Sequence, residues 1–278
     1  MMNLNLMIDP VIMNALREDM PFGDITTDAL FTGEETGTAR LVAKQDGVVS
    51  GLFVAGRVFE LIDNEIVFEP LAKEGEKVEK GRVIANIAGR TASILKGERT
   101  ALNFLQRMSG ISTYTSLLCG MVAERKVKVS DTRKTLPGLR TLDKYAVKAG
   151  GGSNHRFSLS DGVMLKDNHI RAAGGISQAI RKTRESIPHT MKIEVETETL
   201  DQVREALGEK ADIIMLDNMD IPMIREAVAL INGQAQVEVS GNIDASNIRE
   251  KALEGVDIIS CGGLTHSVSG MDISLKFL

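Results

Sequence analysis

The second half of the sequence alternates short apolar runs with longer helical patterns, and this alternation constrains the fold more than any other feature. Runs rich in valine and isoleucine occupy residues 127–130, 163–165, 193–195, 213–216, 237–239 and 258–260. Each run is short enough to be a buried strand. Strands that alternate with helices imply a parallel sheet joined by right-handed crossovers. The sequence therefore predicts an α/β domain.

Helical periodicity fills the segments between these runs. It covers residues 139–149, 176–186, 199–207, 221–230 and 245–253. Six strand runs, preceded by a helix that begins near Glu98, fall short of the eight βα units of a complete barrel. The pattern favours an incomplete α/β barrel, and an open doubly wound sheet is the alternative.

Two of the predicted strands are polar at every second position. In residues 192–196 and 236–240, the polar side chains of each strand share one face. Strands buried on both faces are usually apolar throughout, and buried charges need partners or ligands. We interpret the polar faces as the lining of a barrel interior. The alternative is that these strands lie at an exposed sheet edge, where charges are common.

The first part of the chain, up to about residue 97, has a different pattern. A short helix is expected at residues 11–17, with strands at 38–43, 47–51 and 83–87. These elements indicate a small α+β unit. Its turn-rich segment 70–81 is similar to biotinyl and lipoyl carrier domains, but it lacks a lysine in the flanking methionine context of those domains. We interpret it as scaffold.

Composition excludes several classes of protein. The net charge of −5 and the absence of tryptophan give no basis for nucleic-acid binding. No apolar run reaches the length of about 20 residues that a membrane span needs, and the N-terminus has no secretory pattern. Cys119 and Cys261 lack metal-ligand spacing. We expect both cysteines to be reduced and buried, and the protein to be cytoplasmic.

Basic residues cluster at the carboxyl ends of the early strands, which is where α/β barrels place their active sites. They are Arg133, Lys134, His155, Arg156 and Lys166. Arginine matches carboxylate or phosphate with a planar fork, and lysine provides a point charge. We interpret the five as the lining of one anion site. The alternative is a set of solvated surface charges.

The middle and last strands end in acidic residues and glycine turns. Glu196 and Asp217 offer the oxygen ligands that Mg²⁺ prefers, although direct ion pairs with Lys166 or Lys134 are an alternative. The last two strands end in Ser240-Gly241-Asn242 and Cys261-Gly262-Gly263. Backbone N–H groups in such turns bind phosphate. The set suits a carboxylate-rich ligand, a magnesium pyrophosphate and a sugar phosphate.

Nine sequence strings resemble the quinolinate phosphoribosyltransferase family, also called carboxylating nicotinate-nucleotide pyrophosphorylases. The strings, in chain order, are GDITT (23–27), ERTALN (98–103), DTRKT (131–135), GGSNHR (151–156), LKDNH (165–169), EVE (194–196), LDN (216–218), VSG (239–241) and LTH (264–266). The strings occur in the family's order, and the resemblance covers essentially the whole chain.

The resemblance implies a fold and an assembly. The fold is an N-terminal α/β sandwich over residues 1–108, joined by residues 268–278, and an incomplete, seven-stranded α/β barrel over residues 109–267. The assembly is a homodimer in which Arg99 reaches the partner's active site. The implied reaction transfers phosphoribosyl from phosphoribosyl pyrophosphate to quinolinate. Loss of carbon dioxide then gives nicotinate mononucleotide.

The same resemblance assigns roles to the candidate residues. Those expected to bind quinolinate are Arg99, Arg133, His155, Arg156 and Lys166. Those expected to bind phosphoribosyl pyrophosphate are Lys134, Ser240, Gly241, Asn242, Gly262, Gly263 and His266. Glu196 and Asp217 would hold Mg²⁺ and the ribose hydroxyls, and with Lys134 and Lys166 they form the expected catalytic set. Asn242 stands where many members have glycine, so its backbone is less free.

Two alternatives stay open. One is a paralogous phosphoribosyltransferase of the same fold, specific for nicotinate or associated with molybdenum transport. The chain has all the cations expected to bind a second carboxylate, and this favours quinolinate over nicotinate as the substrate. The other is a sugar-phosphate-binding module without turnover, against which the acidic pair argues weakly.

Overall fold

A computed structural model describes residues 4–278, which form two compact units. The first unit comprises residues up to Ser116 together with Thr135–Gly151 and Ser267–Leu278. The second comprises Leu117–Lys134 and Gly152–His266. The long helix α4 (Thr91–Met121) contributes residues to both units.

A four-stranded antiparallel sheet, in the order β12-β1-β5-β3, is the centre of the first unit. Its strands are β1 (Thr36–Ala43), β3 (Val67–Pro70), β5 (Val83–Arg90) and β12 (Ile273–Phe277). The last strand of the chain thus pairs with β1, with Leu41 opposite Leu275. Two short strands, β2 (Gly47–Val48) and β4 (Lys77–Val78), pair separately.

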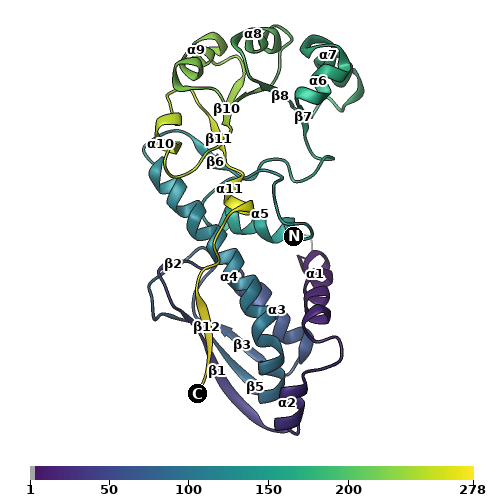
Figure 1. Ribbon diagram of the computed structural model, residues 1–278, viewed down its shortest axis with the longest axis vertical. Coiled ribbons are helices and arrows are strands. Elements are labelled where there is room, and N and C mark those ends of the chain that lie inside the picture. The colour runs from purple at the N-terminus through teal and green to yellow at the C-terminus, as the bar shows by residue number, and fades with distance from the viewer. Residues whose placement is uncertain (1–3) are drawn as a thin grey trace. The chain divides into compact units, whose positions relative to one another are not determined.

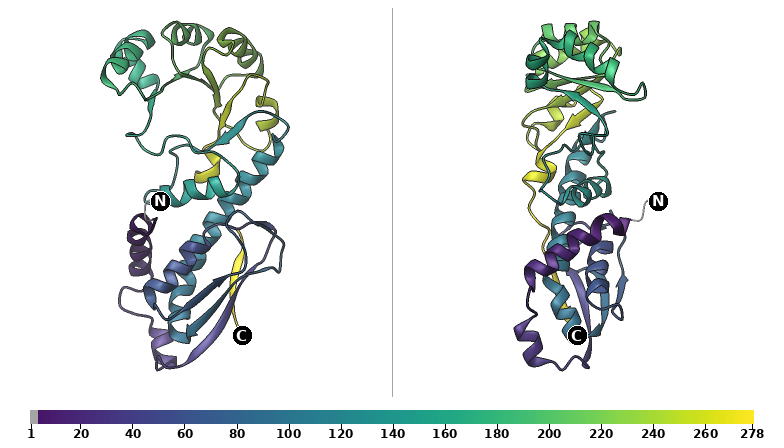
Figure 2. Two further views of the ribbon diagram at one scale, coloured as in Figure 1. Left: turned by 180° about the vertical axis from the view of Figure 1, so that it is seen from behind. Right: turned by 90° about the vertical axis from the view of Figure 1, so that its right-hand side faces the viewer.

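Helices pack against this sheet (Figure 2). The first unit contains α1 (Leu4–Asp19), α2 (Ile25–Leu30), α3 (Leu52–Ile62), α5 (Arg140–Ala149) and most of α4. The ring of Phe59 on α3 stacks on Phe68 of β3, with 6.1 Å between centroids. At Gly97 of α4, a Cβ atom would lie 2.7 Å from the Phe59 ring. Glycine therefore lets α4 approach α3 closely.

A buried ion pair links α4 to α5. The Nε and Nη2 atoms of Arg107 donate to the two carboxylate oxygens of Asp143, at 2.9 and 2.7 Å. Asp143 is fully buried and also accepts the backbone N–H of Leu136. The charge of Asp143 is thereby paired and its oxygens are hydrogen-bonded, as burial requires.

Six parallel strands, in the order β6-β11-β10-β9-β8-β7, form the sheet of the second unit. They are β6 (Lys128–Ser130), β7 (Val163–Leu165), β8 (Ile193–Thr197), β9 (Ile213–Asp217), β10 (Gln236–Ser240) and β11 (Ile258–Ser260). The helices are α6 (Asp167–Ala173), α7 (Ile176–Ser186), α8 (Leu200–Gly208), α9 (Ile221–Ile231), α10 (Ile248–Lys251) and α11 (Gly263–His266). Helices α7, α8 and α9 form an outer arc around the strands (Figure 1).

The sheet curves as a barrel does but is not closed, because β6 and β7 do not pair within residues 4–278. The α/β class and the incomplete barrel are thus confirmed. In place of the implied seventh strand, Ser153 makes an isolated parallel bridge to Ser130. Its N–H donates to Val129 O at 2.8 Å. Three glycines, 150–152, precede it, and glycine lowers strand stability.

Local chemistry explains where the helices begin. Thr199 caps α8 by accepting the N–H of Gln202, and Asp220 caps α9 by accepting the N–H of Met223. The helix expected over residues 245–253 is shorter, because Asp244 instead accepts both the N–H and the hydroxyl of Ser246. Such side-chain bonds compete with helix formation.

Candidate active site

The polar faces of β8 and β10 point into the barrel interior. Glu194 and Glu238 are 3% and 1% exposed, so the exposed-edge interpretation is wrong for these positions. Glu196 is half-buried, and Lys192, just before β8, is exposed and donates to Gln236 at 2.8 Å. Along β8, the polar side chains therefore change from solvent-exposed at the amino end to buried in the middle, and the last one lies near the candidate site.

A cavity of about 290 Å³ opens among the carboxyl ends of the strands. Its lining residues are Thr132, Arg133, Lys134, His155, Arg156, Met164, Lys166, Glu196, Met215, Asp217, Glu238, Ser240 and Ser260. All five cations predicted at strand ends are present, and so are both predicted carboxylates. The five cations thus line one cavity, and Lys134 and Lys166 are also exposed to solvent.

The two arginines make this cavity electropositive. Arg156 donates from Nη1 to Gly162 O at 2.9 Å, which fixes its direction. Burial, and then repulsion from Arg133, lower the pKa of Arg156. The Nε atom of Arg133 is buried and makes no hydrogen bond to any residue in 4–278. A buried donor without an acceptor is costly, so these groups suit an anionic ligand.

Lys166 and Glu196 form an ion pair at the cavity, with 3.4 Å between Nζ and Oε2. Burial raises the pKa of Glu196, and the charge of Asp217 raises it further, while Lys166 lowers it. Two carboxylates that repel each other beside a cavity form a donor set of hard oxygens, which fits Mg²⁺. The alternative to a metal site was a direct ion pair between Glu196 and Lys166. The structure contains this pair, but its N–O distance of 3.4 Å is long and the lysine is half-exposed.

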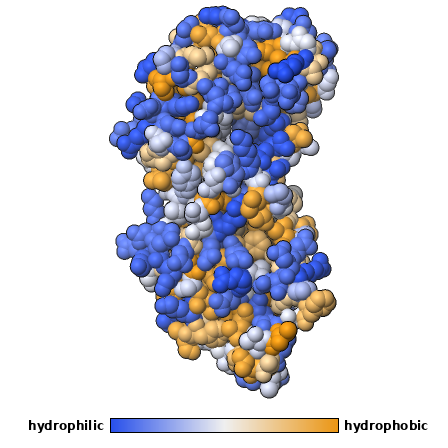
Figure 3. Space-filling view, viewed as in Figure 1, coloured by the Kyte–Doolittle hydropathy of each residue, from blue (hydrophilic) through white to orange (hydrophobic). Residues whose placement is uncertain are grey.

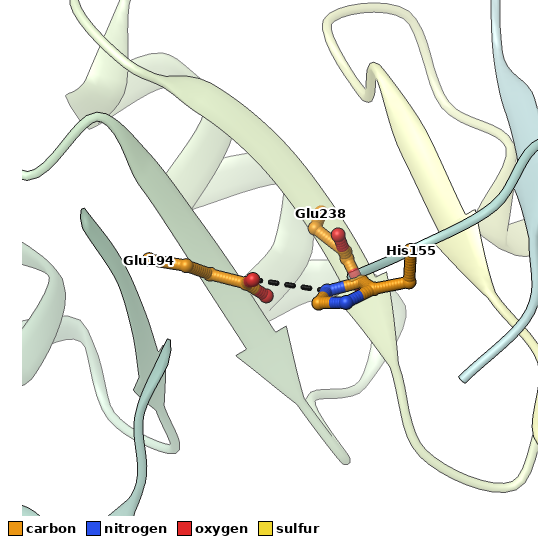
Figure 4. A group of neighbouring side chains, drawn as sticks. All are labelled: His155, Glu194 and Glu238. Carbon is orange, nitrogen blue, oxygen red and sulfur yellow. Dashed lines mark ion pairs between the residues drawn. The ribbon is translucent and has the colours of Figure 1, made fainter. Parts of the chain in front are cut away.

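His155 contacts both buried glutamates (Figure 4). Its Nε2 atom lies 2.9 Å from Glu194 Oε2 and 3.7 Å from Glu238 Oε1. Its Nδ1 atom accepts the N–H of Arg156 at 2.8 Å. This pattern assigns the ring proton to Nε2, which donates to Glu194. A protonated nitrogen cannot ligate a metal, so proximity of the three side chains does not make them a metal site.

Asp131 orders the loop that carries His155. It is fully buried at the end of β6 and accepts the N–H of His155 at 2.9 Å and the Asn154 amide at 2.6 Å. Asp131 was not among the residues predicted for the site. Its signal was its place directly after a predicted strand, among the cations. It acts on the cavity through the backbone of His155.

The expected phosphate-binding turns flank the cavity. Ser240 lines it, and Gly241 and Asn242 follow with φ of 97° and 51°. A Cβ atom at Gly241 would lie 2.3 Å from Asn218 Oδ1, so only glycine fits. Asparagine tolerates the left-handed conformation that Asn242 adopts.

The second turn lies beside Lys134. A Cβ atom at Gly262 would lie 2.9 Å from the Lys134 side chain and 3.2 Å from His266. Thr265 on α11 donates its hydroxyl to Lys134 O at 2.9 Å. Gly263 begins α11, and His266 is exposed at its end. A hydrogen bond therefore connects the segment after β11 to the segment after β6.

Two predictions concern residues elsewhere. Arg99 belongs to the first unit, on α4, and is exposed there. Of the cysteines, Cys261 is buried and donates to Ile243 O at 3.0 Å, as expected. Cys119 is only half-buried, and both are free thiols.

The cavity is also lined by residues that were not predicted from the sequence. They are Thr132, Met164, Met215, Glu238 and Ser260. Met164, Met215 and Ser260 lie within strands, where period two predicts which face they share but not how far the cavity extends. No helix in residues 4–278 is long and apolar enough to cross a membrane.

Both parts of the chain match family models. The model described as quinolinate phosphoribosyl transferase, N-terminal domain, matches residues 24–109, and the C-terminal domain of the same family matches residues 111–276. Together they cover most of the chain.

Relatives of the chain support the same assignment. The chain is 42% identical over 271 residues to the probable nicotinate-nucleotide pyrophosphorylase [carboxylating] of Bacillus subtilis, covering 98% of this chain and 93% of that protein. It is 43% identical over 285 residues to the chloroplastic enzyme of that name from Arabidopsis thaliana, covering 96% and 81%. The crystal structure of NadC from Streptococcus pyogenes superposes with a TM-score of 0.94 at 43% identity, covering 99% and 98%. The chain belongs to the quinolinate phosphoribosyltransferase family.

Proposed function

We propose that the protein transfers the phosphoribosyl group of phosphoribosyl pyrophosphate to quinolinate with decarboxylation. The products are nicotinate mononucleotide, pyrophosphate and carbon dioxide. The observation that carries the proposal is one cavity lined both by Arg133, Arg156 and Lys166 and by two carboxylates, those of Glu196 and Asp217. The curated relatives that share about two fifths of their residues with the chain have names for this activity.

The cationic wall suits a pyridine with adjacent carboxylates. Arg133 and Arg156 offer planar donors to one dicarboxylate, and Lys166 adds a point charge. Holding the ring in line with the ribose carbon converts an encounter between two ligands into a positioned attack. We assign Arg133, Arg156 and Lys166 to quinolinate. His155 would act by orienting Arg156, since both its ring nitrogens contact protein.

The acidic wall suits the ribose and the metal. As the ring nitrogen attacks, positive charge grows on the ribose, and Glu196 and Asp217 lie where their charge would stabilise it. The same two residues would hold Mg²⁺, directly or through water, and when bound the ion would neutralise the departing pyrophosphate. Lys134 would contact phosphoribosyl pyrophosphate. The turns at Ser240, Gly241 and Asn242, and at Gly262, Gly263 and His266, would seat the 5′-phosphate.

We propose a homodimer in which Arg99 completes the partner's quinolinate site. Arg99 is exposed in the first unit, so its guanidinium is accessible to a partner. The first unit also exposes apolar side chains at and beside α2: Phe22 is 99% exposed, Ile25 87% and Leu30 69%. Figure 3 shows apolar atoms gathered over the part of the molecule that contains α2. Large exposed apolar groups often mark interfaces.

The domain limits are also proposals. We propose a sandwich domain of residues 1–108 with 268–278, and a barrel domain of residues 109–267. The boundary between the two matched family models, at 109–111, supports the first limit. A cytoplasmic location is consistent with two free thiols.

A turnover assay tests the proposed function. The protein is mixed with Mg²⁺, phosphoribosyl pyrophosphate and quinolinate labelled in its 2-carboxylate, and both nicotinate mononucleotide and labelled carbon dioxide are measured. We expect the two products in equal amounts. Binding of both substrates without product would favour the non-catalytic alternative, and mononucleotide from nicotinate alone would favour the nicotinate-specific paralogue.

A further inference from the structure

We propose that Glu238 is the acid that delivers a proton to carbon 2 of the pyridine ring after the carboxylate leaves. This inference rests on the proposed function, because that reaction replaces a carboxylate with hydrogen. A second cavity lies next to the first, and Glu238 lines both.

The second cavity, of about 630 Å³, opens at the amino ends of the barrel strands. Its lining includes Lys128, Val163, Ile213, Gln236 and Ile258, which are the first residues of their strands. The two cavities share three residues, His155, Arg156 and Glu238. A single layer of side chains therefore separates the candidate active site from a polar space wide enough for water.

Glu238 is the member of this layer that suits a neutral acid. Its side chain is 1% exposed and extends toward Glu194 and His155 (Figure 4). Its Oε1 atom and Glu194 Oε1 have no hydrogen-bond partner among residues 4–278. A carboxylate oxygen of Glu238 lies within 4.8 Å of one of Glu194. Two buried carboxylates at that distance cannot both be charged without a large cost. One proton on the pair would remove that cost.

Hydrogen bonding distinguishes the two glutamates and leaves Glu238 as the one that suits a proton. His155 donates from Nε2 to Glu194 at 2.9 Å. Glu238 is 3.7 Å from the same nitrogen, too far for a comparable bond. Burial, and then the charge of Glu194, raise the pKa of Glu238 to about 7. His155 and the hydroxyl of Ser260 act in the opposite direction.

The chemistry balances with one proton. The bond between carbon 2 and its carboxylate breaks, carbon dioxide leaves, and the electron pair stays on carbon 2 beside the quaternary nitrogen. That pair takes the proton of the Glu238 carboxylic acid, and Glu238 becomes a carboxylate. Water in the second cavity returns the proton. A donor whose pKa lies near the working pH is the most effective kind.

The charged and titratable groups around Glu238 are consistent with this role. Glu194 acts on it from β8, His155 from the loop after Ser153, and Ser260 from the neighbouring strand β11. Arg156 lines both cavities together with Glu238. A neutral Glu238 also avoids repelling the quinolinate carboxylate before it leaves.

The test compares single-turnover formation of nicotinate mononucleotide by the wild-type protein and by Glu238→Gln. Glutamine keeps the shape of a neutral carboxylic acid but cannot donate to carbon. We expect the rate to fall about 100-fold, as loss of a general acid does, with the Kd of quinolinate changed less than about threefold. Glu198→Gln, an exposed position just after β8, is the matched control and should be as fast as wild type.

Further readouts separate proton donation from a structural role. The wild-type rate should fall above neutral pH and in D₂O, Glu238→Gln should lose the pH-dependent fall, and Glu238→Asp should retain it at a lower rate. A Glu238→Gln protein that matches wild type, or that loses quinolinate binding in proportion to rate, overturns the assignment. If Glu238→Gln does not fold, a wild-type rate insensitive to both pH and D₂O overturns it.

Wild-type turnover is measured first. Its absence contradicts the proposed function, and with it this assignment. An active wild type beside an equally active Glu238→Gln overturns the assignment alone.

Discussion

The Nε2 atom of His155 lies 2.9 Å from the Oε2 atom of Glu194 inside the barrel. The contact joins a loop residue of the candidate active site to a strand residue that is 3% exposed. It engages a ring nitrogen of His155, a residue that sequence reasoning assigned to quinolinate. The positive charge of the cavity therefore comes from arginine and lysine. His155 instead contacts the buried glutamates Glu194 and Glu238.

Arg133→Ala should weaken quinolinate binding far more than phosphoribosyl pyrophosphate binding. The lost guanidinium is partly buried, and removing one partner of such a pair costs about 2 kcal/mol or more. The Kd of quinolinate should rise at least ~30-fold, with less than about a threefold change for phosphoribosyl pyrophosphate. Calorimetric titration measures both. Arg181→Ala, an exposed arginine paired with Glu209, is the control. Equal losses for the two ligands would contradict the assigned roles.

Glu196→Gln should impair turnover while quinolinate still binds. The substitution removes one of two charges assigned to the metal and the ribose, and such losses reduce kcat by roughly 100-fold or more. Binding of Mn²⁺ in the presence of phosphoribosyl pyrophosphate, followed by electron paramagnetic resonance, should weaken in parallel. Undiminished Mn²⁺ binding would remove Glu196 from the metal site.

Glu238→Gln should change how stability depends on pH. Because the folded-state pKa of Glu238 is about 7, above its ordinary value of 4.5, the folded protein holds this proton more tightly than the unfolded chain does. Wild-type stability therefore falls as pH rises from about 4.5 to about 7. Glutamine does not titrate. The free energy of unfolding of the variant, relative to wild type, should be higher at pH 8 than at pH 5, by up to about 3 kcal/mol.

Urea unfolding at the two pH values measures this difference. Glu198→Gln again serves as the control and should show the same pH dependence as wild type. A relative stability of Glu238→Gln that does not change with pH would mean that Glu238 is already charged in the folded protein at pH 5.

Asp143→Ala should destabilise the first unit. The carboxylate is fully buried and accepts two hydrogen bonds from Arg107. Breaking a buried pair costs about 3 kcal/mol or more, because it leaves an uncompensated charge. Asp201→Ala removes an aspartate that is 94% exposed in its pair with Arg204, and should cost less than about 1 kcal/mol. Similar midpoints for the two variants in urea unfolding would show that the Arg107 pair contributes little.

Mixing two inactive variants tests the shared site. Arg99→Ala lacks the residue proposed to cross the interface, and Glu196→Gln lacks a residue of the barrel. After unfolding and refolding together, half of the dimers should be mixed, and each mixed dimer has one intact site. Activity should recover to roughly a quarter of wild type. No recovery, with mixed dimers confirmed by mass spectrometry, would contradict an Arg99 that acts in the partner's site.

The barrel could be predicted from the sequence because its signals are local. Residues 176–186 were expected as a helix, and α7 has the same limits. The strands β3 and β4 were missed, since Val67–Pro70 ends in proline and Lys77–Val78 is short and flanked by charges. Their pairing depends on partners distant in the chain, which local propensity does not contain.

The candidate site, like the fold, could be predicted only in part from the sequence. Residues at the carboxyl ends of parallel strands converge whatever their side chains, so Arg133, Lys166 and Glu196 could be grouped without a structure. The role of His155 could not be predicted, because it depends on which nitrogen meets Glu194 and which meets the Arg156 backbone. Those contacts depend on how deeply the loop that carries His155 enters the barrel. Sequence periodicity predicts which face of a strand a side chain occupies, but it does not predict how deeply a loop is buried.

The comparison of quinolinate with nicotinate as substrates tests the central claim most directly. The claim is that the cations of one cavity bind two adjacent carboxylates. With the wild-type protein, phosphoribosyl pyrophosphate and Mg²⁺, kcat/KM for quinolinate should exceed that for nicotinate by at least about 100-fold, because nicotinate would leave buried cations unpaired. Equal values for the two substrates, or a preference for nicotinate, would contradict it.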